Sequence, residues 1–180
     1  HQELMAGLTL LDKNIPVDTL IVESTRGTYE NGHTITFEGE VDRFASEIAK
    51  VLNDGGCVLV PSFALGRMQE LLNVISRLQA DARVPDVPVY ASGLGRAIYE
   101  IYNKFTDFLR PETTLRPLAE FNRIGDVWDG AVRRDLLRRP CIIVATSGMM
   151  VENTPSALIA MEMVRDPRNG IFFVGYLDPD

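Results

Sequence analysis

Apolar and polar positions follow one another along this chain in blocks that predict helices and strands in turn. Apolar residues recur at helical spacing from Phe37 to Val51, and Asp54-Gly55-Gly56 is expected to end that helix. Pro155 suits the first position of another helix, with Thr154 as its cap. The same periodicity predicts helices over 65–78, 98–108, 128–139 and 154–165.

The segments between these helices contain short, uninterrupted apolar runs. A strand buried on both faces has such a continuous run, whereas a strand with one solvated face alternates. The segment 110–127 is the least regular and is expected to hold a short helix and an edge strand. Strands alternating with helices predict an α/β fold, a parallel sheet flanked by helices. The predicted strands cover 18–23, 58–60, 88–92, 142–145 and 171–174.

Two of these strands run straight into a small-residue turn that opens a helix. The segments are Cys57–Arg67 and Cys141–Met150, and each places hydroxyls and free backbone N–H groups after a strand. In open parallel sheets, ligands bind at the carboxyl ends of the strands. Because N–H groups at a helix start favour anions, we expect a phosphate-bearing ligand there.

Neither turn carries a complete nucleotide-binding motif. Pro61–Arg67 has no Walker lysine, and Ser92-Gly93-Leu94-Gly95 lacks the third glycine of a dinucleotide fingerprint. The two histidines, His1 and His33, are too few for a usual zinc site or an arguable Ser-His-Asp set. A free-standing nucleotide-binding module is therefore disfavoured, and the residues alone leave the function open.

Composition and charge narrow the class of protein. The 180 residues are 46% hydrophobic and 24% charged, as in an ordinary soluble globular domain. A net charge of −7 argues against non-specific nucleic-acid binding by the whole domain, because Lys and Arg make phosphate contacts. The basic cluster Arg133–Arg139 is a candidate local site. The alternative is a solvated helix end whose cations complement the helix dipole.

The cysteines and the chain ends suggest a cellular setting. Cys57 and Cys141 each begin an apolar strand and are expected to be buried free thiols, which fits a reducing, cytoplasmic compartment. The apolar runs are too short to span a membrane, and no signal peptide is visible at His1. Because no helix closes the chain before Asp180, we expect a fragment of a longer protein.

Four motifs occur in an order that matches a known family. They resemble the β-CASP branch of the metallo-β-lactamase superfamily, which comprises zinc-dependent nucleases, including the cleavage and polyadenylation specificity factor type. The resemblance implies a two-part enzyme in which a metallo-β-lactamase domain holds two zinc ions and the β-CASP domain is inserted as a cap. The motifs are Leu20–Gly27, Leu59–Leu72, Ala145–Met150 and Asp166–Tyr176.

The resemblance also implies domain boundaries. Residues 1–28 would be the end of the metallo-β-lactamase stretch, and 29–180 would be the β-CASP domain. The family's zinc-ligand motifs do not occur in this chain, so no metal ligand is expected here. The metallo-β-lactamase domain of the same protein is then an implied partner. Oligomeric state stays open, a homodimer included.

One catalytic motif of the family is implied for the segment before the cap. Glu23 matches the first acidic motif, where a carboxylate can accept the ring N–H of a zinc-ligating histidine. The alternative is a solvated loop charge. Arg26 stands where the family usually has an aromatic residue, which leaves the nature of the active-site wall open. His33, where relatives often carry a histidine, fits a structural hydrogen bond as well as a place near substrate.

The two turns gain roles in binding the substrate. Arg67 can bind a phosphate with two parallel hydrogen bonds, which a lysine cannot do. The alternative is that Ser62 and Thr146 cap helices while Arg67 pairs with Glu70 or Glu23. The phosphate contacts implied by the resemblance are Ser62, Arg67, Thr146, Ser147 and Gly148.

The resemblance therefore predicts a zinc-dependent hydrolase that processes RNA, single-stranded RNA in particular. This chain would be its cap, would help to bind the RNA backbone, and would be inactive alone. Two alternatives stay open. One is a DNA-directed nuclease of the same branch, and the other is a non-catalytic scaffold subunit of an RNA-processing complex, against which the retained Glu23 argues.

Overall fold

The computed structural model describes residues 16–21, 34–111 and 113–175. Within these residues, five strands form one parallel sheet in the order β3-β2-β4-β1-β5. The strands are β1 (Val58–Pro61), β2 (Val89–Ser92), β3 (Asn122–Arg123), β4 (Ile142–Ala145) and β5 (Gly170–Ile171).

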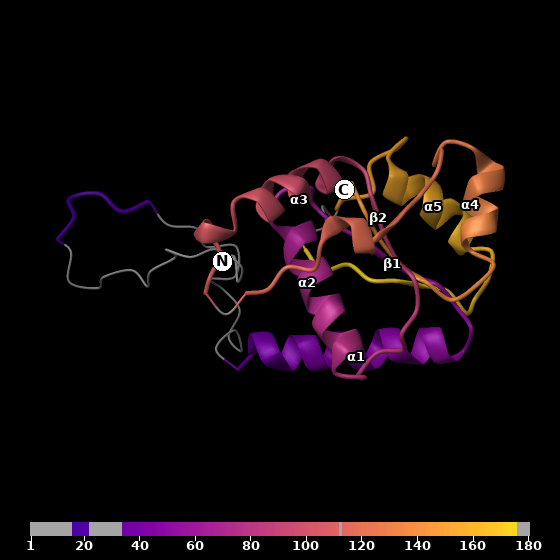
Figure 1. Cartoon of the computed structure of the whole chain (residues 1–180), viewed down its shortest axis with the longest axis horizontal. Helices are drawn as coiled ribbons and strands as arrows, with labels where there is room; N and C mark the ends of the chain where they lie inside the picture. The colour runs from indigo at the N-terminus through magenta and orange to yellow at the C-terminus, as the bar shows by residue number, and fades with distance from the viewer. Residues whose placement is uncertain (1–15, 22–33, 112, 176–180) are drawn as a thin grey trace.

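Helices connect the strands and cover both faces of the sheet. Figure 1 shows α1 along one side of the molecule and α4 and α5 gathered at the other, with the strands between them. The fold is the predicted α/β sheet flanked by helices. The helices are α1 (Phe37–Asn53), α2 (Arg67–Ala80), α3 (Leu94–Lys104), α4 (Gly130–Leu136) and α5 (Pro155–Met163), with short 3-10 turns η1 (Thr106–Phe108) and η2 (Leu118–Glu120).

Successive strand residues enter two separate apolar cores. Val58 and Val60 of β1 join Ile142 in a cluster with α1, α2 and α3. Leu59 and Ile143 point the other way, into a cluster with the buried residues of α5. Side chains alternate between the faces of a sheet, so both sets are buried only because helices cover both faces. The uninterrupted apolar strands of the sequence are thereby explained.

Most predicted elements agree with the structure to within a few residues, but two apolar segments do not. The described part of the predicted strand 18–23, Asp18–Ile21, is not a strand, and Ile21 is 94% exposed. A strand needs a neighbour for its N–H and C=O groups, and none lies beside this segment among the described residues. The predicted strand 171–174 is also shorter, because only Gly170–Ile171 pair with β1.

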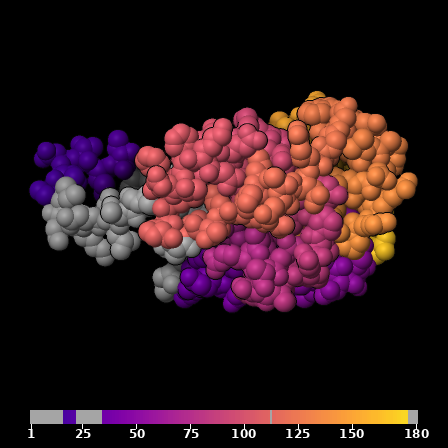
Figure 2. All heavy atoms as spheres, in the orientation of Figure 1, coloured from indigo at the N-terminus to yellow at the C-terminus, as the bar shows by residue number. Residues whose placement is uncertain are grey.

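The irregular segment after α3 forms the short 3-10 turn η2 and the edge strand β3, as expected. In the space-filling view, the chain from α3 to α4 makes up most of the near face, with α1 along its lower edge (Figure 2). None of the helices within the described ranges has the length and apolar character that a membrane span requires.

Candidate nucleic-acid interface

Three adjacent strands bring the predicted turns together at the carboxyl edge of the sheet. Pro61 of β1 and Ser92 of β2 are both in register with Ala145 of β4. The residues that follow these strands therefore lie side by side. The Ser62 N–H donates to the Ala145 carbonyl at 2.9 Å. The two turns that the sequence places after strands therefore meet at one edge of the sheet.

The turn after β4 is held by the start of α5. Ser156 donates its N–H to the Thr146 carbonyl at 2.9 Å and its hydroxyl to the Ser147 carbonyl at 2.7 Å. The Ser147 hydroxyl accepts the Val151 N–H at 3.3 Å. Ser156 is fully buried, so this anchor is shielded from water. Thr146 and Ser147 themselves are half-buried and face the edge of the sheet.

Gly148 lets the two turns touch. A Cβ built on Gly148 would lie 2.9 Å from the Phe63 nitrogen and 3.0 Å from the Ser62 carbonyl carbon. Real Cβ atoms do not approach backbone this closely without a shift, so a side chain here would push the turns apart. Gly148 thus has a packing role at the edge where the family resemblance puts a phosphate contact.

A buried glutamine that the sequence analysis missed organises the turn between β1 and α2. Gln69 accepts the Gly66 N–H at 2.7 Å and donates to the Ala64 and Gly95 carbonyls at 3.0 and 3.1 Å. It is fully buried. Its position four residues after Leu65 puts it on the apolar face of the helical pattern, and that signal could have found it.

The interpretation of Ser62 and Thr146 as helix caps is wrong. Helix α2 is capped by Gly66, and the cap of α5 is Thr154. The Ser62 hydroxyl is buried and has no hydrogen-bond partner in the described part of the chain. A ligand at the surface of this edge would therefore reach Thr146 and Ser147 before it reached Ser62.

Arg67 forms the ion pair with Glu70 that the sequence offered as an alternative to a phosphate contact. Its Nη1 lies 2.6 Å from Glu70 Oε2. The Glu70 side chain is 8% exposed, whereas that of Arg67 is 41% exposed. A guanidinium carries five N–H donors, so one carboxylate does not exhaust it. Glu70 orients Arg67 and leaves donors open to solvent.

A third strand end joins this edge, although the sequence analysis set it aside as an incomplete fingerprint. Ser92 ends β2, and Gly93 follows with φ of +81°. A Cβ on Gly93 would lie 2.1 Å from Thr146 Oγ1, so glycine permits this close approach. The two glycines of Ser92–Gly95 serve backbone packing at the edge. Gly95 similarly lies against Met68.

The basic cluster Arg133–Arg139 is largely taken up by ion pairs. Arg133 and Arg134 lie 3.7 and 3.9 Å from Glu162, and Arg138 pairs with Asp135 at 3.4 Å. Arg133 also donates to the Val127 carbonyl at 2.8 Å, and its side chain is only 14% exposed. Arg133 and Arg134 serve the α4–α5 contact, and Arg133 is half-buried rather than solvated as a free helix end would be.

The two cysteines are buried free thiols, as predicted. Each precedes a strand, β1 or β4, whose first residues are in register, so the thiols are neighbours on the α4–α5 side of the sheet. The hydrogen bond with Cys57, and burial after it, raise the pKa of the Cys141 thiol above its ordinary value. The same hydrogen bond lowers the pKa of the Cys57 thiol, which is buried like that of Cys141.

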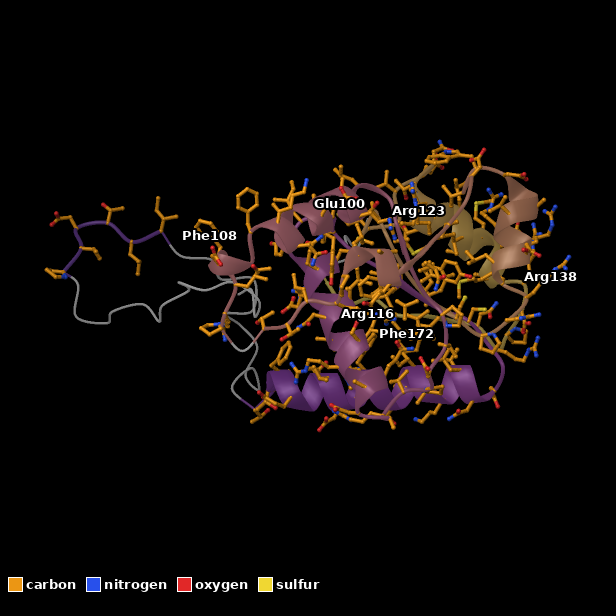
Figure 3. All side chains as sticks on the ribbon, in the orientation of Figure 1. Glu100, Phe108, Arg116, Arg123, Arg138 and Phe172 are labelled. Carbon is orange, nitrogen blue, oxygen red and sulfur yellow. The ribbon has the colours of Figure 1, made fainter. Side chains whose placement is uncertain are left out.

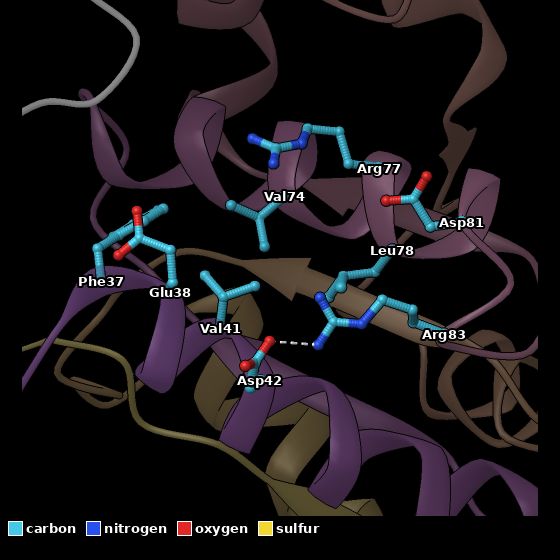
Figure 4. A pocket seen from close by; sticks show the side chains of 9 residues that line it. All are labelled: Phe37, Glu38, Val41, Asp42, Val74, Arg77, Leu78, Asp81 and Arg83. Atoms are coloured by element: carbon cyan, nitrogen blue, oxygen red, sulfur yellow. Dashed lines mark hydrogen bonds and ion pairs between the residues drawn. The ribbon is translucent and has the colours of Figure 1, made fainter.

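A pocket of about 260 Å³ lies between α1 and α2 (Figure 4). The Arg83 guanidinium donates to Asp42 at 2.6 Å across its mouth. None of the predicted site residues within the described ranges lines this pocket. Its lining residues are Phe37, Glu38, Val41, Asp42, Val74, Arg77, Leu78, Asp81 and Arg83.

The predicted catalytic acid Glu23 lies outside the described residues, as do Arg26 and His33. No group of three His, Cys, Asp or Glu side chains that could hold a metal ion occurs within the described ranges. These residues therefore do not fit a zinc site, and no chemical step through zinc is derived from them.

Comparison with known families decides what kind of domain this edge belongs to. Residues 68–180, more than half of the chain, match the Beta-Casp domain family. This chain belongs to the Beta-Casp domain family. The matched segment covers α2 through β5, and α1 and β1, which precede it, are part of the same sheet and core.

Several relatives of this Beta-Casp chain are named as RNA-processing proteins. It is 31% identical over 162 residues to an RNase J-like protein of Methanocaldococcus jannaschii, with 89% of this chain and 37% of the relative covered. It is 33% identical over 165 residues to cleavage and polyadenylation specificity factor 73 of Drosophila melanogaster, covering 88% and 23%. It is 31% identical over 160 residues to RNase aCSPSF2 of Saccharolobus solfataricus, covering 88% and 30%.

These shares show that the chain spans well under half the length of the relatives it matches. The Beta-Casp fold and the family are therefore assigned to the chain itself. The activity and substrate of a complete protein of this kind are matters for a proposal.

Proposed function

We propose that this chain is the cap of a zinc-dependent RNA-processing phosphodiesterase and that its carboxyl edge binds the backbone of a single-stranded RNA. The observation that carries the proposal is the contact of the β1–α2 turn, which leads into Arg67, with the Thr146–Gly148 turn at one edge of a Beta-Casp sheet. Three relatives with ribonuclease or cleavage-factor names support RNA as the substrate.

The edge offers the donors that a phosphodiester needs. The Arg67 guanidinium, already oriented by Glu70, would form charge-assisted hydrogen bonds with the phosphate oxygens. The half-buried hydroxyls of Thr146 and Ser147 would add neutral donors beside it. Such contacts hold the sugar-phosphate backbone and do not read bases, which suits an enzyme that processes strands of varied sequence.

The remainder of the enzyme would lie outside the described residues. We assign 1–28 to a neighbouring metallo-β-lactamase domain and 29–180 to the cap. The exposed Leu20 and Ile21 support this division, because two neighbouring apolar side chains in water are suited to a strand whose partner belongs elsewhere. Two zinc ions, held by residues outside this chain, would supply an activated water, and the chain alone would be inactive.

The first experiment substitutes Arg67 in the full-length protein that carries this chain. Arg67→Gln should raise the Kd for a single-stranded RNA roughly 10-fold or more, because a hydrogen bond to a charged group contributes about 1.5–3 kcal/mol. Arg67→Lys should recover only part of the loss, since lysine cannot bind a phosphate bidentately. Fluorescence anisotropy with labelled RNA measures both.

The control variant replaces Arg165, which forms the same kind of ion pair as Arg67. Arg165 pairs with the nearly buried Glu162 at 2.7 Å, three residues apart, as Arg67 pairs with Glu70 at 2.6 Å. Arg165→Gln should leave the Kd unchanged. Equal Kd values for wild type and Arg67→Gln would contradict the proposal. Equal affinity for single-stranded DNA of the same sequence would instead favour a DNA-directed member of the branch.

A further inference from the structure

Two arginines lie together where β2 and β3 end. Arg96, in the first turn of α3, points its Nη1 back at the carbonyls of Ala91, Phe121 and Asn122, at 3.5, 3.4 and 3.3 Å. Its guanidinium is therefore held by the backbone of both strands. Arg123, the last residue of β3, is in register with Ala91.

Register places the two guanidiniums on one face. In a parallel pair, residues in register point to the same side of the sheet. Ala91 is buried in the cluster that includes Tyr99 of α3, so the Arg123 side chain leaves the edge strand on the α3 side, where Arg96 lies. In the shared orientation of Figures 1 and 3, Arg123 lies close to β2, between α3 and α5.

Most arginines that the structure describes in this acidic chain are paired with an acid, and this pair is not. Arg67, Arg133 and Arg168 each lie within 4 Å of a carboxylate oxygen. No ion pair joins Arg96 or Arg123 to an acid within the described residues, although the charge of Glu100 acts on Arg96.

The two positive charges also oppose one another. Burial, and next the charge of Arg123, lower the pKa of the Arg96 guanidinium from its ordinary value. Two like charges close to one another without an acid between them are destabilising, and an anion between them would relieve the repulsion. The arrangement is therefore suited to binding a negatively charged group.

We propose that Arg96 and Arg123 form a second phosphate-binding point for the same RNA strand, which crosses the carboxyl edge of the sheet from β1 toward β3. This inference rests on the proposed function. Neighbouring strands lie about 4.8 Å apart, so three spacings separate β1 from β3, about 14 Å. A phosphate at Arg96 and Arg123 therefore belongs to a different nucleotide from the one at Arg67.

The test compares strands of two lengths in the full-length protein. Arg123 is exposed on a two-residue edge strand, so Arg123→Gln should fold normally. For a long single-stranded RNA, the substitution should raise the Kd several-fold and make the slope of log K against log salt shallower by about 0.7, the value for one lost phosphate contact. A dinucleotide, which spans only the Arg67 end, should bind the variant and wild type alike.

Two further variants sharpen the result. Arg123→Lys should restore the salt slope, because it restores the charge. Arg138→Gln is the matched control, since Arg138 is an exposed arginine that lies far from Arg123 (Figure 3) and should leave binding unchanged.

The outcomes separate this inference from the proposed function. If Arg67→Gln weakens RNA binding but Arg123→Gln leaves the long-strand salt slope unchanged, the second binding point is overturned and the proposed function stands. If Arg123→Gln weakens the dinucleotide as much as the long strand, the crossing path is overturned. If wild type binds neither strand, the proposed function itself fails.

Discussion

At the scale of single residues, Gln69 ties together the segments that surround the candidate interface. Its amide reaches Ala64 and Gly66 in the turn after β1 and Gly95 at the start of α3. A fully buried amide with three partners holds these backbones in one arrangement. The position of Arg67, two residues earlier in the chain, depends on that arrangement.

We predict that Gln69→Met destabilises the protein by about 1–3 kcal/mol, because it leaves buried backbone groups without partners. It should also weaken RNA binding, since the turn that presents Arg67 is released. Gln79→Met is the matched control, because Gln79 also donates to two carbonyls, those of Pro85 and Val87, away from the edge. Urea unfolding and anisotropy measure the two effects.

The control should lose stability and keep its affinity for RNA under conditions where it is folded. Equal affinities of Gln69→Met and wild type, despite the loss of stability, would show that the turn is positioned by other contacts. A Gln69→Met variant as stable as wild type would mean that water forms the hydrogen bonds that the Gln69 amide had made to the backbone.

At the scale of elements, the edge depends on how closely the β2–α3 turn approaches the β4 turn. Gly93 has φ of +81° and its α-carbon faces Thr146 Oγ1, where a Cβ would lie 2.1 Å away. Gly55, at the end of α1, has the same φ, yet a Cβ there would meet only Arg168 Nη1 at 3.7 Å. Comparing substitutions at these two glycines therefore separates the cost of a left-handed backbone from the cost of a steric clash.

We predict that Gly93→Ala costs more stability than Gly55→Ala. Both substitutions force alanine into a left-handed conformation, at about 1–3 kcal/mol. Only Gly93→Ala adds a clash, which Thr146→Ala in the same chain should relieve. A double-mutant cycle from urea unfolding measures this coupling. Additive free energies in the cycle would mean that the turns do not touch in solution.

At the scale of the whole molecule, the sheet separates two apolar cores, and the thiols of Cys57 and Cys141 lie in the core on the α4–α5 side. Both are nearly fully buried, and the pKa of the Cys141 thiol is raised. A thiolate attacks the disulfide of a thiol reagent, and a buried thiol meets the reagent only when the fold opens.

We predict that Ellman's reagent labels both thiols only as fast as unfolding allows. With an unfolding free energy of about 5–15 kcal/mol, labelling in native buffer should be slower than in urea by three orders of magnitude or more. Introducing a surface thiol by Arg138→Cys supplies the fast control. Rapid native labelling of Cys57 or Cys141 would contradict the two-sided burial of the sheet.

The sequence predicted much of the fold because the information it used is local. The spacing of apolar residues within a helix, and the unbroken apolar runs in β1 and β4, follow from which side chains are buried. The same reasoning was wrong for Asp18–Ile21, since an apolar run does not say whether a partner strand is present. It also missed Gln69, whose helical position indicates the apolar face, because an amide side chain taken by itself is typical of the surface.

The sequence by itself determined the alternation of helices and strands, the two turns with their hydroxyls, and the resemblance that led to the Beta-Casp family. Only the tertiary structure decided that Arg67 pairs with Glu70, that Ser62 caps no helix, and that Arg96 and Arg123 lie at the ends of neighbouring strands. The physical reason is that these contacts depend on strand order and register, which join residues far apart in the chain.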